Sequence, residues 1–158
     1  MKKLLIFVLL ACVLVGCSSK EDIKLQATDV QINEQVISLD QNMSEVIEKI
    51  GTNYKLEESK SCMFDGNDKT YTYENFVINT YPNGNDDFVN SITLLNDTFK
   101  LSKDVHIGDS IDKIKSIMNE TTTLEDEQSC SYEYETYGIT FYLEKQVVSE
   151  IELYLIQK

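Results

Sequence analysis

Few side chains in this 158-residue sequence could support nucleophilic or metal chemistry. The chain has four cysteines, Cys12, Cys17, Cys62 and Cys130, and one histidine, His106. A nucleophilic thiol needs a neighbouring base, and a zinc site needs several His or Cys ligands. The sequence contains no Cys-x-x-Cys pair and no second histidine. We therefore expect no catalytic residue, no metal ligand and no cofactor. We interpret His106 as a solvent-facing residue on which nothing converges, rather than as a ligand or a pH sensor.

Carboxylates, in contrast, are abundant. The sequence has 27 acidic residues against 14 lysines and no arginine, which gives a formal net charge of −13. This balance excludes nucleic acid as a partner, because phosphate binding depends on clustered Lys and Arg. The oxygen-rich segments 65–68 and 83–87 could bind Ca²⁺, but neither has EF-hand spacing, and turns favour the same residue types. We interpret both segments, and the acidic run 125–127, as solvated turns or loops. No carboxylate stands in an apolar setting of the kind that raises the pKa of a general acid.

Two similar segments follow one another in the body of the chain. The apolar residues of segment 37–50 match those of segment 105–118 at one constant offset, and the same offset aligns Cys62 with Cys130. Further along, segment 71–81 matches segment 132–142, which aligns Tyr81 with Tyr142. We therefore predict a tandem repeat with its two units at 30–96 and 97–158.

Each unit has the pattern of one helix followed by strands. Apolar residues recur at helical spacing after a capping residue, Asn42 in the first unit and Ser110 in the second. Around Ile139 and Ile151 the apolar period becomes two, which is typical of half-buried antiparallel strands. Segments 30–39 and 98–107 each add a leading strand or arm. We predict an α+β fold of two tandem helix-plus-antiparallel-meander repeats, with the helices on one face of a curved sheet.

This predicted architecture, over residues 36 to 156, resembles the fold shared by the β-lactamase inhibitor protein and the small outer-membrane assembly lipoproteins. The segments Ser61-Cys62 and Asp68-Lys69-Thr70-Tyr71-Thr72-Tyr73 are also similar to stretches in uncharacterised repeat lipoproteins of Firmicutes. The chain departs from the inhibitor by lacking two cysteines in each repeat. The resemblance implies the fold and a binding role, and it does not imply that a β-lactamase is the target.

The N-terminus has the pattern of an export signal. Two lysines precede an apolar run that is too short to span a bilayer, and the sequence Leu14-Val15-Gly16-Cys17 follows. These four residues resemble the lipobox of bacterial lipoproteins, in which the cysteine is acylated and becomes the mature N-terminus. The resemblance implies a signal peptide at 1–16 and lipidation of Cys17. It also implies a linker to residue 29 and a location at the cell membrane, lipid-anchored and facing the extracytoplasmic side.

Export and lipidation would leave Cys62 and Cys130 as the two thiols of the mature chain. Exported proteins form disulfides, and the two residues occupy matched positions in the repeat. A disulfide joining the two copies is therefore expected. The alternative is that both are small buried residues whose sites lie too far apart to bridge.

The strand pattern also predicts an aromatic face. If the aliphatic residues of the strands point toward the helices, then Tyr81, Leu95, Tyr142 and Tyr154 point to the opposite side. Such a face could bind another envelope protein, or it could be cross-strand packing with no partner. We expect a non-catalytic protein-binding or scaffold module. The alternatives are a small-ligand sensor or hydrolase of the cell envelope, and a structural spacer.

Overall fold

The computed structural model describes residues 24–119 and 124–156. The expected signal peptide at 1–16 and the expected lipidation residue Cys17 lie outside the described residues. Strands make up 50% of the described residues and helices 12%. The elements in chain order are β1 (Asp29–Ile32), β2 (Gln35–Ser38), α1 (Met43–Ile50), β3 (Lys55–Lys60), β4 (Asn67–Thr72), β5 (Phe76–Asn83), β6 (Asp86–Leu94), β7 (Lys100–Leu101), α2 (Ile111–Met118), β8 (Leu124–Glu125), β9 (Ser129–Glu133), β10 (Tyr137–Glu144) and β11 (Val147–Leu155).

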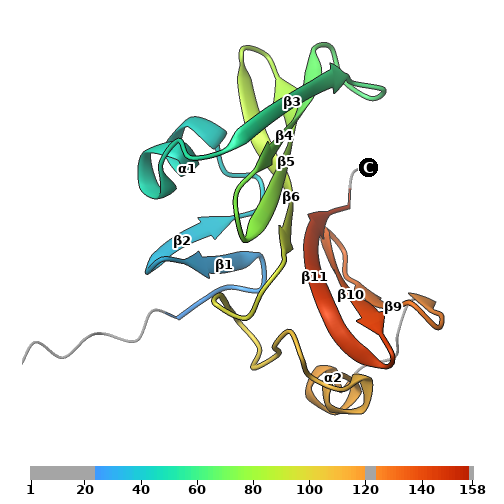
Figure 1. Ribbon diagram of the computed structural model, residues 1–158. Helices are drawn as coiled ribbons and strands as arrows, with labels where there is room; N and C mark the ends of the chain where they lie inside the picture. Colours follow the sequence, from blue (N-terminus) through green and yellow to red (C-terminus); the bar gives the residue numbers. More distant parts are fainter. Residues whose placement is uncertain (1–23, 120–123, 157–158) are drawn as a thin grey trace, which may run out of the picture.

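An eight-stranded antiparallel sheet dominates the structure. Its strand order is β3-β4-β5-β6-β11-β10-β9-β8, so the chain builds it inward from two opposite edges. The two halves meet where β6 pairs with β11, from Ser91 opposite Tyr154 to Leu94 opposite Ile151. Figure 1 shows the halves as two groups of strands, β3 to β6 in green and β9 to β11 in orange and red.

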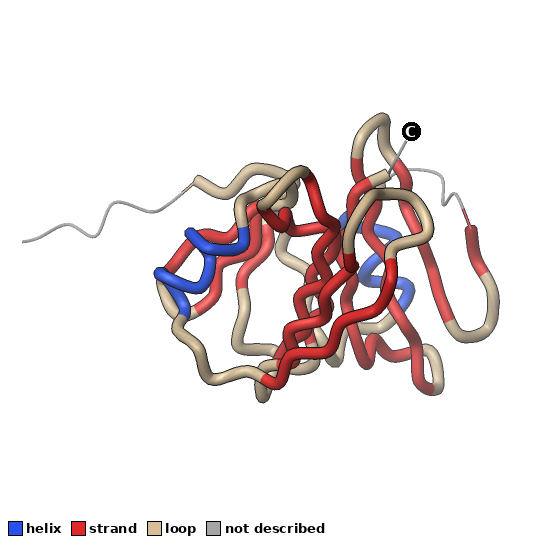
Figure 2. The backbone as a smooth tube through the Cα atoms, turned by 90° about the horizontal axis from the view of Figure 1, so that it is seen from above, coloured by secondary structure: helices blue, strands red, loops and turns tan. Residues whose placement is uncertain are grey.

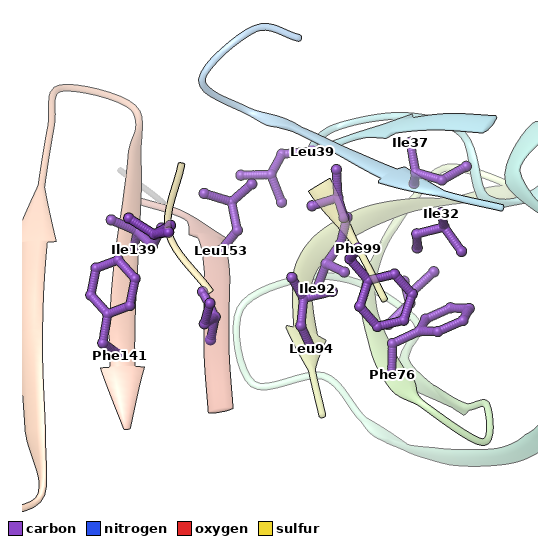
Figure 3. Close-up of a cluster of buried hydrophobic side chains, with 14 of the residues drawn as sticks. Ile32, Ile37, Leu39, Phe76, Ile92, Leu94, Phe99, Ile139, Phe141 and Leu153 are labelled. Atoms are coloured by element: carbon purple, nitrogen blue, oxygen red, sulfur yellow. The ribbon is translucent and has the colours of Figure 1, made fainter. Parts of the chain in front are cut away.

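A second, three-stranded sheet with the order β2-β1-β7 closes the core. Its central strand, β1, pairs with β2, which follows it directly in the chain. On its other side β1 pairs with β7, which is distant in sequence, with Val30 opposite Leu101. Figure 3 shows apolar side chains of this N-terminal region facing those of the eight-stranded sheet. The buried residues in that view include Ile32, Ile37, Leu39, Phe76, Ile92, Leu94, Phe99, Ile139, Phe141 and Leu153.

Both helices are short, and each has clear boundary signals. The Asn42 side chain accepts a hydrogen bond from the N–H of Ser44, and the Ser110 hydroxyl accepts one from the N–H of Lys113. The first helix ends at Gly51 with φ of 87°, and the second ends at the left-handed Asn119. Neither of these described helices is long and apolar enough to cross a membrane.

The expected fold class, α+β with two helix-plus-meander repeats, is wrong, because the structure is mostly β. The helices have eight residues each and form no layer over the sheet, and Figure 2 shows them apart with strands between them. Their caps and end residues restrict them to two turns. The segments expected to be leading arms instead pair with each other, and their sheet covers the core that the helices were expected to cover.

Candidate functional site

The eight-stranded sheet has one apolar face and one polar face. Its register places Ile78 opposite Ile92 in the core and Asn79 opposite Ser91 on the other side, which we call the open face. Thr70 on β4 continues the row of Asn79. Its hydroxyl donates to Asn79 Oδ1 over 2.8 Å, and Asn79 Nδ2 donates to Ser91 Oγ over 3.1 Å. The polar side chains of the first half therefore satisfy one another across three strands.

Two adjoining hollows lie along the open face, and together we call them the groove. The first lobe has a volume of about 450 Å³ and the second about 440 Å³. Both are lined by Asn90, Ser91 and Glu152, so the lobes meet where β6 pairs with β11. The first lobe is further lined by Ser61, Cys62, Met63, Phe64, Asp68, Lys69, Thr70, Asn79, Thr80 and Tyr81. The second is further lined by Leu124, Ser129, Ser131, Glu133, Thr140, Tyr142, Tyr154 and Leu155.

The first lobe is bounded by the loop between β3 and β4. The Ser61 hydroxyl accepts hydrogen bonds from the backbone N–H groups of Met63 and Phe64 at 3.4 and 3.2 Å. This turn places the Phe64 ring against Tyr81, with 5.1 Å between the ring centroids. The Tyr81 hydroxyl donates to the Asp40 carboxylate, and burial together with this hydrogen bond raises the pKa of Tyr81 to about 12. The lobe therefore has an apolar wall with an ordered aromatic pair.

Among the described residues that line the groove, Lys69 is the only lysine. Its ammonium group forms an ion pair with Asp87 over 2.6 Å, and both side chains are largely shielded from solvent. The hydrogen bond to Asp87 raises the pKa of Lys69. The positive charge of Lys69 is thus already matched within the protein.

The second lobe combines tyrosine hydroxyls with carboxylates. Tyr142 donates to Glu152 Oε2 over 2.8 Å, and Tyr154 donates to Glu133 Oε1 over 3.2 Å. Burial, followed by the bond to Glu152, raises the pKa of Tyr142 to about 12. The Tyr154 ring lies over Gly138, where a Cβ atom would come within 2.3 Å of the ring. The ring therefore lies flat on the sheet, and Gly138 makes room for it.

The structure brings three of the four predicted face residues into the groove. Tyr81 lines the first lobe, and Tyr142 and Tyr154 line the second. Leu95 is exposed but lies just beyond the end of β6, where its N–H bonds to the carbonyl of Asn75, and it lines neither lobe. Their role in binding a partner stays a prediction.

Sequence reasoning overlooked the groove residues Phe64, Glu133 and Glu152. The period-two pattern of β11 could have identified Glu152, because it alternates with the buried Ile151 and Leu153. Phe64 and Glu133 carried no comparable signal, since a loop turn and a tyrosine on another strand bring them to the groove.

The predicted equivalence of Tyr81 and Tyr142 depends on the point from which the strands are counted. Each central hairpin has one β-bulge. The extra residue is Asn90 of β6, opposite the step from Asn79 to Thr80, and Ser149 of β11, opposite the step from Tyr142 to Leu143. Counted from the bulges, Tyr142 therefore corresponds to Asn79, and Tyr81 corresponds to Glu144. Counted from the preceding turns, where the Tyr73 N–H bonds to the Phe76 carbonyl and the Tyr134 N–H to the Tyr137 carbonyl, Tyr81 and Tyr142 do correspond. The two counts differ because the hairpins have different lengths between the turn and the bulge.

The expected disulfide between Cys62 and Cys130 is wrong, because both thiols are free. Cys62 is exposed in the loop between β3 and β4, whereas Cys130 is buried within β9, opposite Phe141 of β10. Burial raises the pKa of the Cys130 thiol. The constant sequence offset had placed the two residues at matched positions. One lies in a loop and the other in a strand, so the match in sequence does not bring the two thiols to the geometry that a disulfide needs.

His106 has partners that the sequence did not indicate. Its Nδ1 lies 2.8 Å from Asp97 and its Nε2 lies 2.9 Å from Asp104, and these hydrogen bonds raise its pKa. The expectation that nothing converges on His106 is therefore wrong. Within residues 24–119 and 124–156, no group of three His, Cys, Asp or Glu side chains could hold a metal ion.

The comparisons with known proteins bear on the first half of the chain. Residues 22–106 match the family described as a domain of unknown function, DUF7738. The match spans the three-stranded sheet and strands β3 to β6, and it ends before α2. No curated protein and no solved structure matches the chain. Since the match covers more than half of the sequence, the chain belongs to the DUF7738 family.

Proposed function

We propose that this protein is a non-catalytic binding module of the cell envelope, anchored to the membrane through lipid on Cys17, whose groove binds a basic segment of another protein. The observation that carries the proposal is the composition of the groove. Tyrosine rings and three carboxylates, those of Asp68, Glu133 and Glu152, line it, and the ammonium group of Lys69 is already paired. Such a surface is complementary to a cationic partner.

Shape and overall charge support the same proposal. The groove is shallow and extends over several strands, as a surface for a polypeptide does, whereas small-molecule sites are usually enclosed. The formal net charge of −13 adds a long-range attraction for a basic partner. At high ionic strength this attraction is screened, so salt should slow association.

The hydrolase alternative has less support from the groove carboxylates. Glu133 and Glu152 each accept a hydrogen bond from a tyrosine hydroxyl. One oxygen of each carboxylate is therefore already engaged within the protein, whereas a general acid or base must reach the substrate atom with which it exchanges a proton. For a small-ligand sensor, the cavity next to Leu101 and Met118 offers a volume of only about 30 Å³, which is too small for most ligands.

Site-specific photocrosslinking in intact source cells tests the proposal. The full-length protein would carry p-benzoylphenylalanine in place of Tyr142, which lines the groove and is 38% exposed. The matched control places the crosslinker at Val147, which is 39% exposed on the hairpin of β10 and β11 but lines neither lobe. We expect one protein to be captured from position 142 and not from position 147.

Binding measurements with purified proteins then distinguish direct binding in the groove from mere proximity in the cell. The captured protein would be purified and its affinity measured for the wild type and for a variant with Tyr81, Tyr142 and Tyr154 changed to Ser. We expect the variant to bind at least about tenfold more weakly while remaining folded by circular dichroism. Equal affinity, or equal capture from both crosslinker positions, would refute the groove as the binding surface and favour a spacer role.

A further inference from the structure

The groove has a pattern along its length that specifies its ligand further. Met63 lines the first lobe and is 67% exposed, and Leu124 lines the second and is 61% exposed. Met63 belongs to the loop that joins β3 to β4, near one edge of the sheet, whereas Leu124 belongs to β8 at the other edge. Glu152 lies between them, where the lobes meet. Exposed apolar side chains therefore stand near both ends of the groove, and the carboxylate of Glu152 stands at its centre, where the two lobes meet.

The central carboxylate is prepared for a cation. Tyr142 donates to one oxygen of Glu152 and so fixes the orientation of the carboxylate. The rings of Tyr142 and Tyr154 line the same lobe, and aromatic faces beside a carboxylate favour a Lys ammonium or an Arg guanidinium. Because the Lys69 ammonium is paired with Asp87, no ammonium group of the described lining residues is left to neutralise Glu152 from within the groove.

The direction of the groove determines how a segment would bind. The groove crosses the strands from β4 to β8, which is six inter-strand steps of about 4.8 Å, or about 29 Å. An extended chain advances about 3.3 Å per residue, so about nine residues span the groove. A segment lying across the strands cannot pair with their backbones and is recognised through its side chains.

The alternative of strand addition at a sheet edge has less support. The edge strand β3 reads Lys-Leu-Glu-Glu-Ser-Lys and is exposed along its whole length. Charged residues of this kind on an edge strand oppose pairing with another chain.

We infer that the groove binds an extended segment of about nine residues, with a Lys or Arg near its centre on Glu152 and apolar side chains near its ends on Met63 and Leu124. This inference rests on the proposed function, because it specifies the partner segment of the same groove. It differs from that proposal in requiring one central basic residue, and this requirement is tested separately.

Selection from a library of random nine-residue peptides displayed on phage tests the inference. The library would be panned against the full-length lipidated protein in nanodiscs and, in parallel, against Glu152→Gln. The matched control is Glu48→Gln, which removes the same charge from an exposed position on α1, outside the groove. We expect sequences with Lys or Arg at the central positions and apolar residues at both ends. Glu152→Gln should lose the basic preference and keep the apolar one, and Glu48→Gln should select as the wild type does.

Fluorescence anisotropy with the most enriched peptide then measures the central contact. Replacing its central basic residue with norleucine should weaken binding to the wild type at least about tenfold and leave binding to Glu152→Gln nearly unchanged. Peptides that need the groove tyrosines and are basic, but carry no basic residue at the central positions, would overturn the inference and leave the proposed function standing. Peptides that bind the variant with Tyr81, Tyr142 and Tyr154 changed to Ser as well as the wild type, or no enrichment over that variant, would overturn both.

Discussion

The two central hairpins, β5–β6 and β10–β11, share a backbone plan but present different chemistry on the open face. Each has one bulge, and each is flanked by a bridge to the residue that caps a helix, Asn42 to Phe88 and Ser110 to Val147. In the first hairpin, neutral side chains bond to one another and the Lys69 ammonium pairs with Asp87. In the second half, the positions that correspond to Lys69 and Asp87, counted along the strands from the bulge, are held by the uncharged residues Gln128 and Gln146.

The second hairpin directs two tyrosine hydroxyls at the carboxylates of Glu133 and Glu152, whereas the first hairpin directs one, that of Tyr81, at Asp40. The difference shows that a shared strand plan does not determine surface chemistry. The first half supplies the apolar loop, and the second half supplies most of the negative charge of the groove. The match to the DUF7738 family covers only the first half, so the half that supplies Glu133 and Glu152 lies beyond the matched region.

The two thiols give the largest predicted difference between the halves. Cys62, in the first half, is exposed, and Cys130, in the second, is buried with a raised pKa. Because the thiolate is the reactive form and Cys130 must become exposed first, we expect it to react with Ellman's reagent at least about 10³-fold more slowly than Cys62. Comparing Cys62→Ser with Cys130→Ser assigns the two rates. If the protein purified without reductant shows no reactive thiol, the residues are bonded and the structure is contradicted.

Gly138 provides the next largest effect, since its lack of a Cβ leaves room for the Tyr154 ring. We expect Gly138→Ala to cost about 1–3 kcal/mol of unfolding free energy, measured by urea denaturation, because the ring must leave the sheet. In a Tyr154→Ala background the same change should cost little. The control is Asn75→Ala in the turn just before β5, where a Cβ is already present. An equal cost of Gly138→Ala in both backgrounds would show that the glycine is needed for another reason.

Lys69 tests whether the ion pair stabilises the first half. Lys69→Met leaves Asp87 shielded from solvent without its cation, and we expect a loss of about 1–2 kcal/mol in urea denaturation. Gln128→Met, at the corresponding position of the second half, should stay within about 0.5 kcal/mol. The double variant Lys69→Met with Asp87→Asn should recover much of the loss. If the two single variants lose equal stability, the comparison between the halves fails at this position.

Much of the strand structure could be predicted from local pattern. Ile139, Phe141 and Leu143 alternate with more polar residues, and all three are buried in β10. The helix starts at Asn42 and Ser110 were also readable, because capping is a local interaction. Features that depend on only a few neighbouring residues, such as strand alternation and helix capping, could therefore be predicted from the sequence.

What failed depended on contacts of long sequence separation. The pairing of Val30 with Leu101 joins β7 to the three-stranded sheet. The sequence of neither short segment indicates that the two will pair. Similarity of sequence also matched Cys62 with Cys130, although one lies in a loop and the other in a strand. The groove carboxylates could not be predicted either. The chain has many acidic residues, and only the fold shows which of them accept hydrogen bonds from tyrosine hydroxyls.

The connection between the halves carries the smallest predicted effect, through pH. His106 lies between Asp97 and Asp104, and its hydrogen bonds, first to Asp104 and then to Asp97, raise its pKa above the ordinary value of 6.5. Below that value His106 is protonated in both the folded and the unfolded protein, so the stabilisation is fully present. As the pH rises through the raised pKa of the folded state, the folded protein also loses the proton and the stabilisation disappears. Because the groups are exposed, we expect only about 0.2–1 kcal/mol.

Urea denaturation of the wild type and of His106→Gln checks this prediction. The wild type should be more stable by that amount at about pH 5.5, and the difference should vanish by about pH 8.5. High salt should reduce the difference at the lower pH, because exposed ion pairs are screened. A difference that grows with pH would mean that neutral His106 is the stabilising form. In that case the segment that connects the two halves is held by a hydrogen bond and not by charge.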